Sequence, residues 1–184
     1  MPSGRHTSSR PMSARHDRVE KIVTRKSFET RNDMDARVRK QMVRLLNQQL
    51  ADTFDLMSQT KHVHWNIKGP HFIGLHKMLD EFVEGLEDYV DVIAERATAL
   101  GGPAAGTVRM AADATRLDEY PMEITRDMDH VRALADRYAA LGEYTRKAIK
   151  IAESADDQDT MDLFIDVSRD IDKWLWFLEA HLQA

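Results

Sequence analysis

Apolar residues recur at intervals of three and four positions along four stretches of the chain. The first two stretches cover residues 33–65 and about 71–100, the third follows Pro121, and the fourth follows aspartates within 156–159. Spacing of this kind is typical of helices that bury one face. Pro121 suits the first turn of the third helix, because a first turn does not use the N–H that proline lacks. The pattern therefore predicts four long amphipathic helices.

Segments rich in glycine and proline separate these helices. Gly69-Pro70 interrupts the chain between the first two helices, and Gly101-Gly102-Pro103 ends the second. Residues 101–121 are mostly small or polar, and they form a longer connection than a helical bundle usually has, with room for one short helix. Four long helices with one long crossover predict an all-α, ferritin-like four-helix bundle.

The composition is that of a helix-rich protein with a sizeable core. The 184 residues are 42% hydrophobic and 31% charged, which fits a single folded domain. The chain has no cysteine, so disulfides and thiolate metal sites are excluded and a reducing compartment is favoured. No apolar run approaches the roughly 18 residues of a membrane span, and the basic N-terminus lacks the apolar part of a secretory signal. We therefore expect a cytoplasmic protein with no membrane partner.

The formal net charge of −5 is distributed unevenly. Residues 1–31 carry eight Lys or Arg and three acids, a net charge of +5, so the remaining 153 residues carry −10. A basic arm on an acidic body can bind nucleic acid by displacing counterions from phosphates, and a solvated leader is the alternative. We predict a flexible basic arm over residues 1–31 and a bundle over residues 32–184. The candidate DNA-binding residues are Arg5, Arg10, Arg15, Arg18, Lys21, Arg25 and Lys26.

Two pairs of potential metal ligands lie on the second predicted helix. His76 and Asp80 are four residues apart, and so are Asp91 and Glu95. Each pair can therefore present two ligands to one ion. Histidine with carboxylates suits iron, manganese or zinc. Either pair taken alone is more often an ordinary part of a helix surface.

The distance between the two pairs suggests that two subunits share each site. Asp80 and Asp91 are eleven residues apart, close to three turns, so all four side chains face one way but lie roughly 16 Å apart along the axis. An antiparallel copy of the helix, crossing near Gly85, would bring each pair opposite the other pair of its mate. This predicts a homodimer with two equivalent metal sites. The alternative is that Gly85 faces a cavity without a partner.

Two more histidines stand near the end of the first helix. His64 can complete each site, because it lies close to the start of the second helix. His62 is two residues away and faces nearly the opposite side, so only one of the two is expected to bind metal. Trp65 would give the site an oxidisable aromatic wall, although such a residue is more often part of a core. His62 and His71 are expected to serve structure or solvent.

A specific series of residues connects these features. His64-Trp65-Asn66 is followed by Lys68-Gly69, Phe72-Ile73, His76 with Asp80, and then Asp91 and Glu95. Four further segments accompany it: EYP at 119–121, LADRY at 134–138, RKAI at 146–149 and SRDIDKWLWFLEAHLQ at 168–183. From about residue 35 to residue 183, the chain resembles the Dps family, the mini-ferritins also called DNA-binding proteins from starved cells.

The resemblance implies a hollow dodecameric shell built from two-fold dimers, with iron oxidised at the dimer interfaces. Two irons would be bound by His64, His76 and Asp80 of one subunit and by Asp91 and Glu95 of its mate. The implied reaction is oxidation of Fe(II) to Fe(III), preferably by hydrogen peroxide, followed by storage of ferric mineral in the cavity and protection of DNA. Trp65 matches the family tryptophan near the metals, which would take up stray oxidising equivalents.

Acidic residues on the third predicted helix are candidates for an ion pore. Asp129, Asp136 and Glu143 recur every seven residues and therefore share one face. Such a stripe could attract cations to a three-fold pore. A solvated helix face is the alternative.

Twelve copies of the basic arm would attach the shell to DNA at many points and without sequence preference, in the nucleoid. Three alternatives remain. The chain is a ferroxidase and iron store whose arm packs on the shell or caps a pore, a non-enzymatic nucleoid-packing protein, or a protein with a zinc-only regulatory site. Zinc or manganese can also substitute for iron at the same ligands.

Overall fold

A computed structural model of the chain describes residues 27–183. These residues form five helices and no strand: α2 (Ala36–Asn66), α3 (Phe72–Ala99), α4 (Val108–Ala114), α5 (Asp127–Ser154) and α6 (Gln158–Ala180). The predicted all-α bundle of four long helices is confirmed, and α4 is the short helix expected within 101–121. Among the described residues, no helix is both long enough and apolar enough to cross a membrane.

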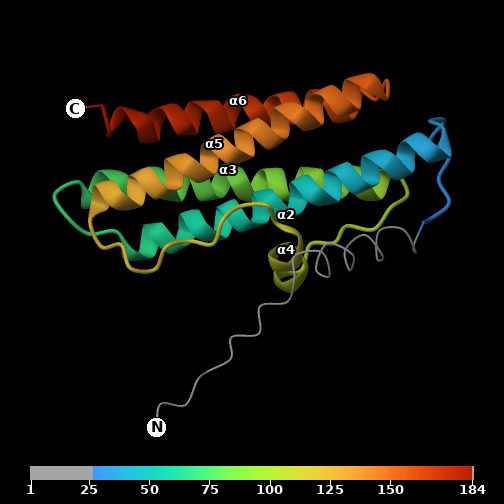
Figure 1. Cartoon of the computed structure of the whole chain (residues 1–184). Coiled ribbons are helices and arrows are strands. Elements are labelled where there is room, and N and C mark those ends of the chain that lie inside the picture. Colours follow the sequence, from blue (N-terminus) through green and yellow to red (C-terminus); the bar gives the residue numbers. More distant parts are fainter. Residues whose placement is uncertain (1–26, 184) are drawn as a thin grey trace, which may run out of the picture.

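The four long helices form two hairpins that pack on each other. Residues 67–71 turn α2 back along α3, and residues 155–157 turn α5 back along α6. The crossover from α3 to α5 runs back over the length of the bundle and carries α4 against α2 (Figure 1). All four candidate histidines therefore lie at or near the single turn between α2 and α3.

Side chains at the helix ends explain where the helices begin. The Asp35 carboxylate accepts a hydrogen bond of 2.9 Å from the backbone N–H of Arg37, which caps α2. Asp157 caps α6 by accepting from the backbone N–H of Thr160 at 3.0 Å. Between α2 and α3, Gly69 has a φ of +125°, which favours glycine. The predicted break between α2 and α3 and the predicted start of α6 are thus confirmed, and α2 begins at Ala36, three residues after the predicted start.

The third long helix begins later than predicted. Pro121 lies in the connection, and α5 begins at Asp127, so the placement of Pro121 in its first turn is wrong. The reason is a tertiary contact. The Tyr120 side chain is buried, and its hydroxyl lies 2.7 Å from Nδ1 of His130. This contact holds the chain around Tyr120 against the first turns of α5, so these residues do not extend the helix.

Three aromatic side chains from three helices meet inside the bundle. The ring centroid of Phe82 in α3 lies 5.8 Å from that of Tyr138 in α5 and 5.5 Å from that of Trp174 in α6. The Tyr138 hydroxyl lies 3.1 Å from the Thr60 hydroxyl of α2, which gives the buried phenol a hydrogen-bond partner. This one cluster therefore joins all four long helices.

A buried carboxylate fixes the second half of the crossover to α2. Asp52 is 0% exposed and accepts hydrogen bonds from the backbone N–H of Arg116 at 2.7 Å and from its Nε at 2.9 Å. Burial raises the pKa of the Asp52 carboxyl, and the contacts with Arg116 oppose that rise. A buried carboxylate is costly unless it is paired, so this contact holds the chain after α4 in one place.

The first described residues are tied to one end of the bundle. The backbone N–H of Phe28 donates to the carbonyl of Gly101 at an N···O distance of 2.8 Å. Gly101 has a φ of +82°, and a Cβ atom there would lie 2.8 Å from the carbonyl oxygen of Phe28. The guanidinium of Arg39 donates to the carbonyls of Asn32 and Met34. These contacts hold residues 28–34 against α2 and the end of α3.

The predicted boundary between arm and bundle falls inside this anchored segment. Residues 27–31 of the predicted arm are described, and Phe28 among them contacts the bundle. The rest of the arm, residues 1–26, lies outside the described residues, and so do all seven candidate DNA-binding residues named above. Their role stays a prediction.

The glycine in the middle of α3 has a different role from the one predicted. A Cβ atom at Gly85 would lie 2.6 Å from Cζ2 and 2.7 Å from Cη2 of Trp174, which packs from α6 of the same subunit. The explanation that Gly85 permits close approach of a second copy of the helix is therefore wrong. The indole ring occupies that space, because Phe82 and Tyr138 pack against it from other sides.

Replacing Gly85 with alanine is expected to destabilise the fold, in contrast to the same change at Gly74. Both glycines lie in α3, but no heavy atom lies within 4 Å of a Cβ placed at Gly74. Gly74→Ala should raise the free energy of unfolding by about 0.5–1 kcal/mol, since alanine favours a helix. Gly85→Ala should lower it by about 1–2 kcal/mol through overpacking. Urea unfolding followed by circular dichroism checks both, and equal effects would contradict the packing described for Trp174.

Candidate metal centre

His64 and His76 form a reciprocal pair at the end of α2 and the start of α3. Nδ1 of His64 lies 2.8 Å from the carbonyl oxygen of His76, and Nδ1 of His76 lies 2.9 Å from the carbonyl oxygen of His64. The rings stack with centroids 3.8 Å apart. A carbonyl can only accept, so both Nδ1 atoms carry a proton in these bonds. In the neutral rings, each Nε2 therefore keeps the lone pair that binds metal.

Asp80 lies one turn beyond His76 on α3 and contacts the same region of α2. Its Oδ1 lies 3.7 Å from Nδ1 of His64 and 2.5 Å from Nζ of Lys61. The hydrogen bond from Lys61 holds the pKa of the Asp80 carboxyl below its usual range. The structure thus brings His64, His76 and Asp80 together, with an ammonium group against the carboxylate.

Lys61 is a residue that the sequence analysis missed. It lies three residues before His64, and so on a neighbouring part of the same helix face. That spacing was visible in the sequence. What was not visible was the register of α2 against α3, which puts Asp80 opposite Lys61.

The other two predicted ligands are not part of this group. Asp91 and Glu95 are exposed on α3, eleven and fifteen residues beyond Asp80. At the rise of an α-helix, Asp91 lies roughly 16 Å from Asp80 along the axis. Within the described part of one subunit, no three His, Asp or Glu side chains are placed so that they could hold a metal ion. Three of the five predicted ligands are thus neighbours within one subunit, and the other two lie farther along α3.

Three large apolar side chains near His64 and His76 in the chain are exposed on the surface. Trp65 is 69% exposed, Ile73 is 60% exposed and Phe72 is 42% exposed. The Phe72 ring centroid lies 5.1 Å from that of His76. Large apolar groups gathered on a surface often mark a contact with another protein chain. The predicted aromatic wall of Trp65 is not formed within one subunit, where its side chain faces outward.

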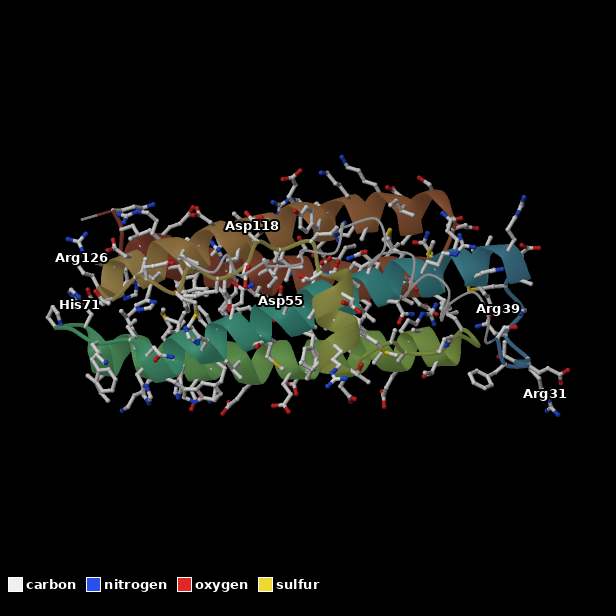
Figure 2. All side chains as sticks on the ribbon, turned by 60° about the horizontal axis from the view of Figure 1, so that its bottom comes forward. Arg31, Arg39, Asp55, His71, Asp118 and Arg126 are labelled. Atoms are coloured by element: carbon white, nitrogen blue, oxygen red, sulfur yellow. The ribbon has the colours of Figure 1, made fainter. Side chains whose placement is uncertain are left out.

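The remaining two histidines of the turn region have structural partners. The His62 ring packs on Tyr120 with centroids 5.2 Å apart. Tyr120 in turn contacts His130, whose pKa is lowered by burial and further by the nearby His62. His71 Nδ1 lies 2.9 Å from Oδ2 of Asp127 and holds the pKa of that carboxyl below its usual range. Figure 2 shows His71 at the end of the bundle where α5 begins.

The acidic residues predicted to line a pore differ in their surroundings. Asp129 is half-buried and pairs with Arg126 at 2.9 Å and with Arg132 at 3.3 Å. Glu143 pairs with Lys147 at 2.5 Å. Asp136 is exposed on α5. Two of the three carboxylates are thus neutralised within the subunit, and the pore itself stays a prediction.

A second acidic surface lies between α3 and α6. A groove of about 500 Å³ is lined by Tyr89 together with Asp159, Asp162, Asp166 and Asp170. The Tyr89 hydroxyl donates to Asp170 Oδ2 at 2.7 Å. The spacing of these aspartates was visible in the sequence. Nothing there distinguished them from an ordinary solvated helix face.

Comparisons with known proteins agree with this fold. A family model described as a ferritin-like domain matches residues 43–184. The DNA protection during starvation protein of Agrobacterium fabrum is 43% identical over 158 residues, which make up 86% of this chain and 98% of that protein. This chain belongs to the Dps family. The resemblance inferred from the residues around His64 and His76 is thereby confirmed.

Solved Dps structures share the arrangement of helices. DpsA14 from Streptomyces coelicolor superposes with a TM-score of 0.81 at 34% identity, over 86% of this chain and 95% of that chain. Dps from Mycobacterium smegmatis, in a tetragonal crystal form, gives a TM-score of 0.81 at 35% identity, over 85% of this chain and 95% of that chain. The ferritin-like Dps fold is therefore established for the bundle.

Removing the charge of Lys61 is expected to tighten metal binding at the half-site. In Lys61→Met, no ammonium group competes with a divalent cation for Asp80, so the Kd for zinc should fall by about tenfold. Zinc is the probe because it accepts the same ligands and is not redox-active. Calorimetric titration of the full-length protein measures the change.

Lys77→Met is the matched control for this experiment. Lys77 is exposed on α3 beside His76, and it makes no ion pair among the described residues. Its replacement removes the same charge and should change the Kd by less than about twofold, as expected for a charge screened by solvent. Equal affinities of wild type and Lys61→Met would show that Lys61 does not compete with metal.

Proposed function

We propose that this Dps-family protein oxidises Fe(II) to Fe(III) at sites shared by two subunits and stores the ferric product inside a dodecameric shell. The reciprocal pair of His64 and His76 carries the proposal. Its hydrogen bonds to carbonyls, 2.8 and 2.9 Å long, use both Nδ1 atoms and leave both Nε2 atoms available for iron. A pair with only a packing role would not need two fixed tautomers.

The proposed site divides its ligands between two antiparallel α3 helices. One subunit provides His64, His76 and Asp80, and its two-fold mate provides Asp91 and Glu95. The exposed Trp65 and its apolar neighbours next to His76 support a subunit contact at this place. Two imidazoles and three carboxylates suit two iron ions and leave positions open for an oxidant and water.

Two irons at one site match the chemistry of hydrogen peroxide. Each Fe(II) loses one electron, so two of them reduce one peroxide molecule, which takes up two protons and leaves as two water molecules. A paired reduction releases no hydroxyl radical, and DNA is protected in this way. Trp65 would absorb an oxidising equivalent that escapes the site.

Asp80 and Lys61 would change partners when iron binds. In the structure the ammonium group compensates the carboxylate, with an N···O distance of 2.5 Å. A cation that binds Asp80 replaces this compensation, so the carboxylate remains paired before and after binding. Lys61 would then turn to solvent, for which its long side chain is suited.

Iron would reach the cavity through acidic surfaces. Asp136 of α5 is the pore residue with the most open surroundings, because Asp129 and Glu143 are engaged by basic neighbours. Negative surfaces raise the local concentration of cations. We assign Asp136 to the pore and leave Asp129 and Glu143 as flanking groups.

The basic arm would attach the shell to DNA in the nucleoid of the cytoplasm. Residues 1–31 carry a net charge of +5, and twelve copies would contact phosphates at many points. The names of relatives as DNA protection during starvation proteins support this role. The binding would be independent of base sequence, because the arm contains no motif that reads bases.

The double variant His76→Ala/Asp80→Ala is expected to oxidise Fe(II) at least about a hundredfold more slowly than wild type, because loss of two ligands removes metal affinity. The control is His181→Ala/Asp88→Ala, which changes the same residue types at exposed positions on α3 and at the end of α6. Stopped-flow absorbance after addition of substoichiometric peroxide measures the rate. A wild-type rate in His76→Ala/Asp80→Ala would refute the site, and a ratio other than two Fe(II) per peroxide would refute the paired reaction.

Neutralising the arm should weaken DNA binding strongly. In the neutral-arm variant, glutamine replaces all seven candidate DNA-binding residues: Arg5, Arg10, Arg15, Arg18, Lys21, Arg25 and Lys26. Its Kd for DNA should be at least about tenfold higher at about 150 mM salt, since each lost phosphate contact weakens binding. Gel shifts with a random-sequence duplex measure it. An unchanged shift would favour the reading in which the arm packs on the shell.

A further inference from the structure

The basic residues in the first turns of α2 differ from most others in the bundle, because they lack close carboxylate partners. Lysines and arginines with a carboxylate partner are Lys61, Arg96, Arg116, Arg126, Arg132, Arg146, Lys147 and Arg169. No ion pair among the described residues involves Lys40 or Arg44, and both side chains are exposed. Arg37 is 92% exposed and lies 3.9 Å from Asp35, a loose contact.

These three cations form a stripe along α2. Arg37, Lys40 and Arg44 follow each other at spacings of three and four residues, so they lie within about 60° of one another around the helix. Residues 36–51 contain no Asp or Glu at all. The next acid, Asp52, is buried against Arg116 and does not offset this charge. The stripe is therefore a local positive surface on a bundle whose net charge is negative, and Asp33 and Asp35 are the acids that precede it.

The stripe lies beside a groove that carries a further cation. The groove has a volume of about 680 Å³ between the start of α2 and the end of α5, and Arg37, Gln41, Lys150 and Ser154 line it. Lys150 is exposed and has no carboxylate partner among residues 27–183. Asp156, at the edge of the groove, is the one acid that lines it. A backbone phosphate in this groove would meet two cations and two neutral hydrogen-bonding side chains, against one carboxylate at the edge.

The described residues of the arm, 27–31, lie at this same end. Phe28 is held against Gly101, and Lys40 lines the pocket of about 540 Å³ next to Phe28. Figure 2 shows Arg31 and Arg39 together at this end, far from His71. Any polyanion that contacts the last residues of the arm is therefore brought next to the stripe.

We propose that Arg37, Lys40, Arg44 and Lys150 form a second DNA-binding surface, on the folded bundle, which contacts backbone phosphates next to the arm. The inference rests on the proposed binding of DNA and assigns part of it to the bundle itself. The arm gathers the duplex, and the stripe fixes it at the end of α2. Linking the two elements in one chain makes the second contact intramolecular, which strengthens binding without further contacts.

The contribution of the stripe to DNA binding should be measurable through the salt dependence of the affinity. Each phosphate neutralised by a lysine or arginine contributes about 0.9 to the slope of log K against log salt concentration. Removing the three cations of α2 should therefore lower the slope by roughly 3 for each engaged subunit. The Kd at about 150 mM salt should rise by about tenfold or more.

The experiment compares two full-length variants with equal changes of charge. The stripe variant is Arg37→Gln/Lys40→Gln/Arg44→Gln. The matched control is Lys68→Gln/Arg109→Gln/Lys173→Gln, whose three cations are exposed and make no ion pair among the described residues. Fluorescence anisotropy with a random-sequence duplex is measured between about 50 and 200 mM KCl, the range over which phosphate contacts change affinity most clearly. Native mass and Fe(II) oxidation at wild-type levels show that both variants are assembled.

A loss of affinity and of salt slope in the stripe variant, with the control within about twofold of wild type, is the expected result. Equal behaviour of the two variants overturns the inference, even where the neutral-arm variant loses binding and the proposed arm function stands. If the stripe variant loses DNA affinity and the neutral-arm variant does not, DNA binds to the bundle, and the proposed binding by the arm is refuted. No binding by wild type at any salt concentration overturns both.

Discussion

The rise of an α-helix, about 1.5 Å per residue, sets the limit on which everything in this site depends. Along α3 it keeps Asp91 and Glu95 far from His76 and Asp80, however the side chains turn. No rearrangement within one subunit removes that separation, because the helix is continuous from Phe72 to Ala99. A catalytic centre that uses both pairs has to be completed by a second chain. The exposed apolar surface around Trp65 is what such a contact requires.

The fold followed from local signals where those signals were sufficient. Apolar spacing identified the long helices, and Gly69, with a φ of +125°, marked the turn that brings α2 beside α3. The start of α5 could not be predicted, because Pro121 permits a helix but does not impose one. The start of α5 is set by the contact of Tyr120 with His130, which joins positions ten residues apart through tertiary packing. The predicted role of Gly85 was wrong for a similar reason. The sequence shows the glycine but not the Trp174 ring that packs against it.

The candidate site was predictable in its residue types and not in its electrostatics. The spacing of His64, His76 and Asp80 in the sequence predicts metal chemistry. The reciprocal bonds that fix both imidazole tautomers depend on the register of α2 against α3, which no local pattern encodes. The same register places Lys61 on Asp80, so that the half-site is a compensated, preorganised group. The spacing of Arg37, Lys40 and Arg44 was visible in the sequence, but only the structure shows that Lys40 and Arg44 make no ion pair among the described residues and that Arg37 makes only a loose one with Asp35.

The proposed site needs residues from two subunits, and mixed shells test this most directly. One partner carries His76→Ala/Asp80→Ala and the other Asp91→Ala/Glu95→Ala, co-expressed with different tags and purified through both. Each variant alone should oxidise Fe(II) very slowly. In mixed shells, half of the dimers are heterodimers, and each heterodimer restores one of its two sites, so about one quarter of the wild-type rate should return. No recovery above that of the separate variants would show that the site does not span the two-fold interface.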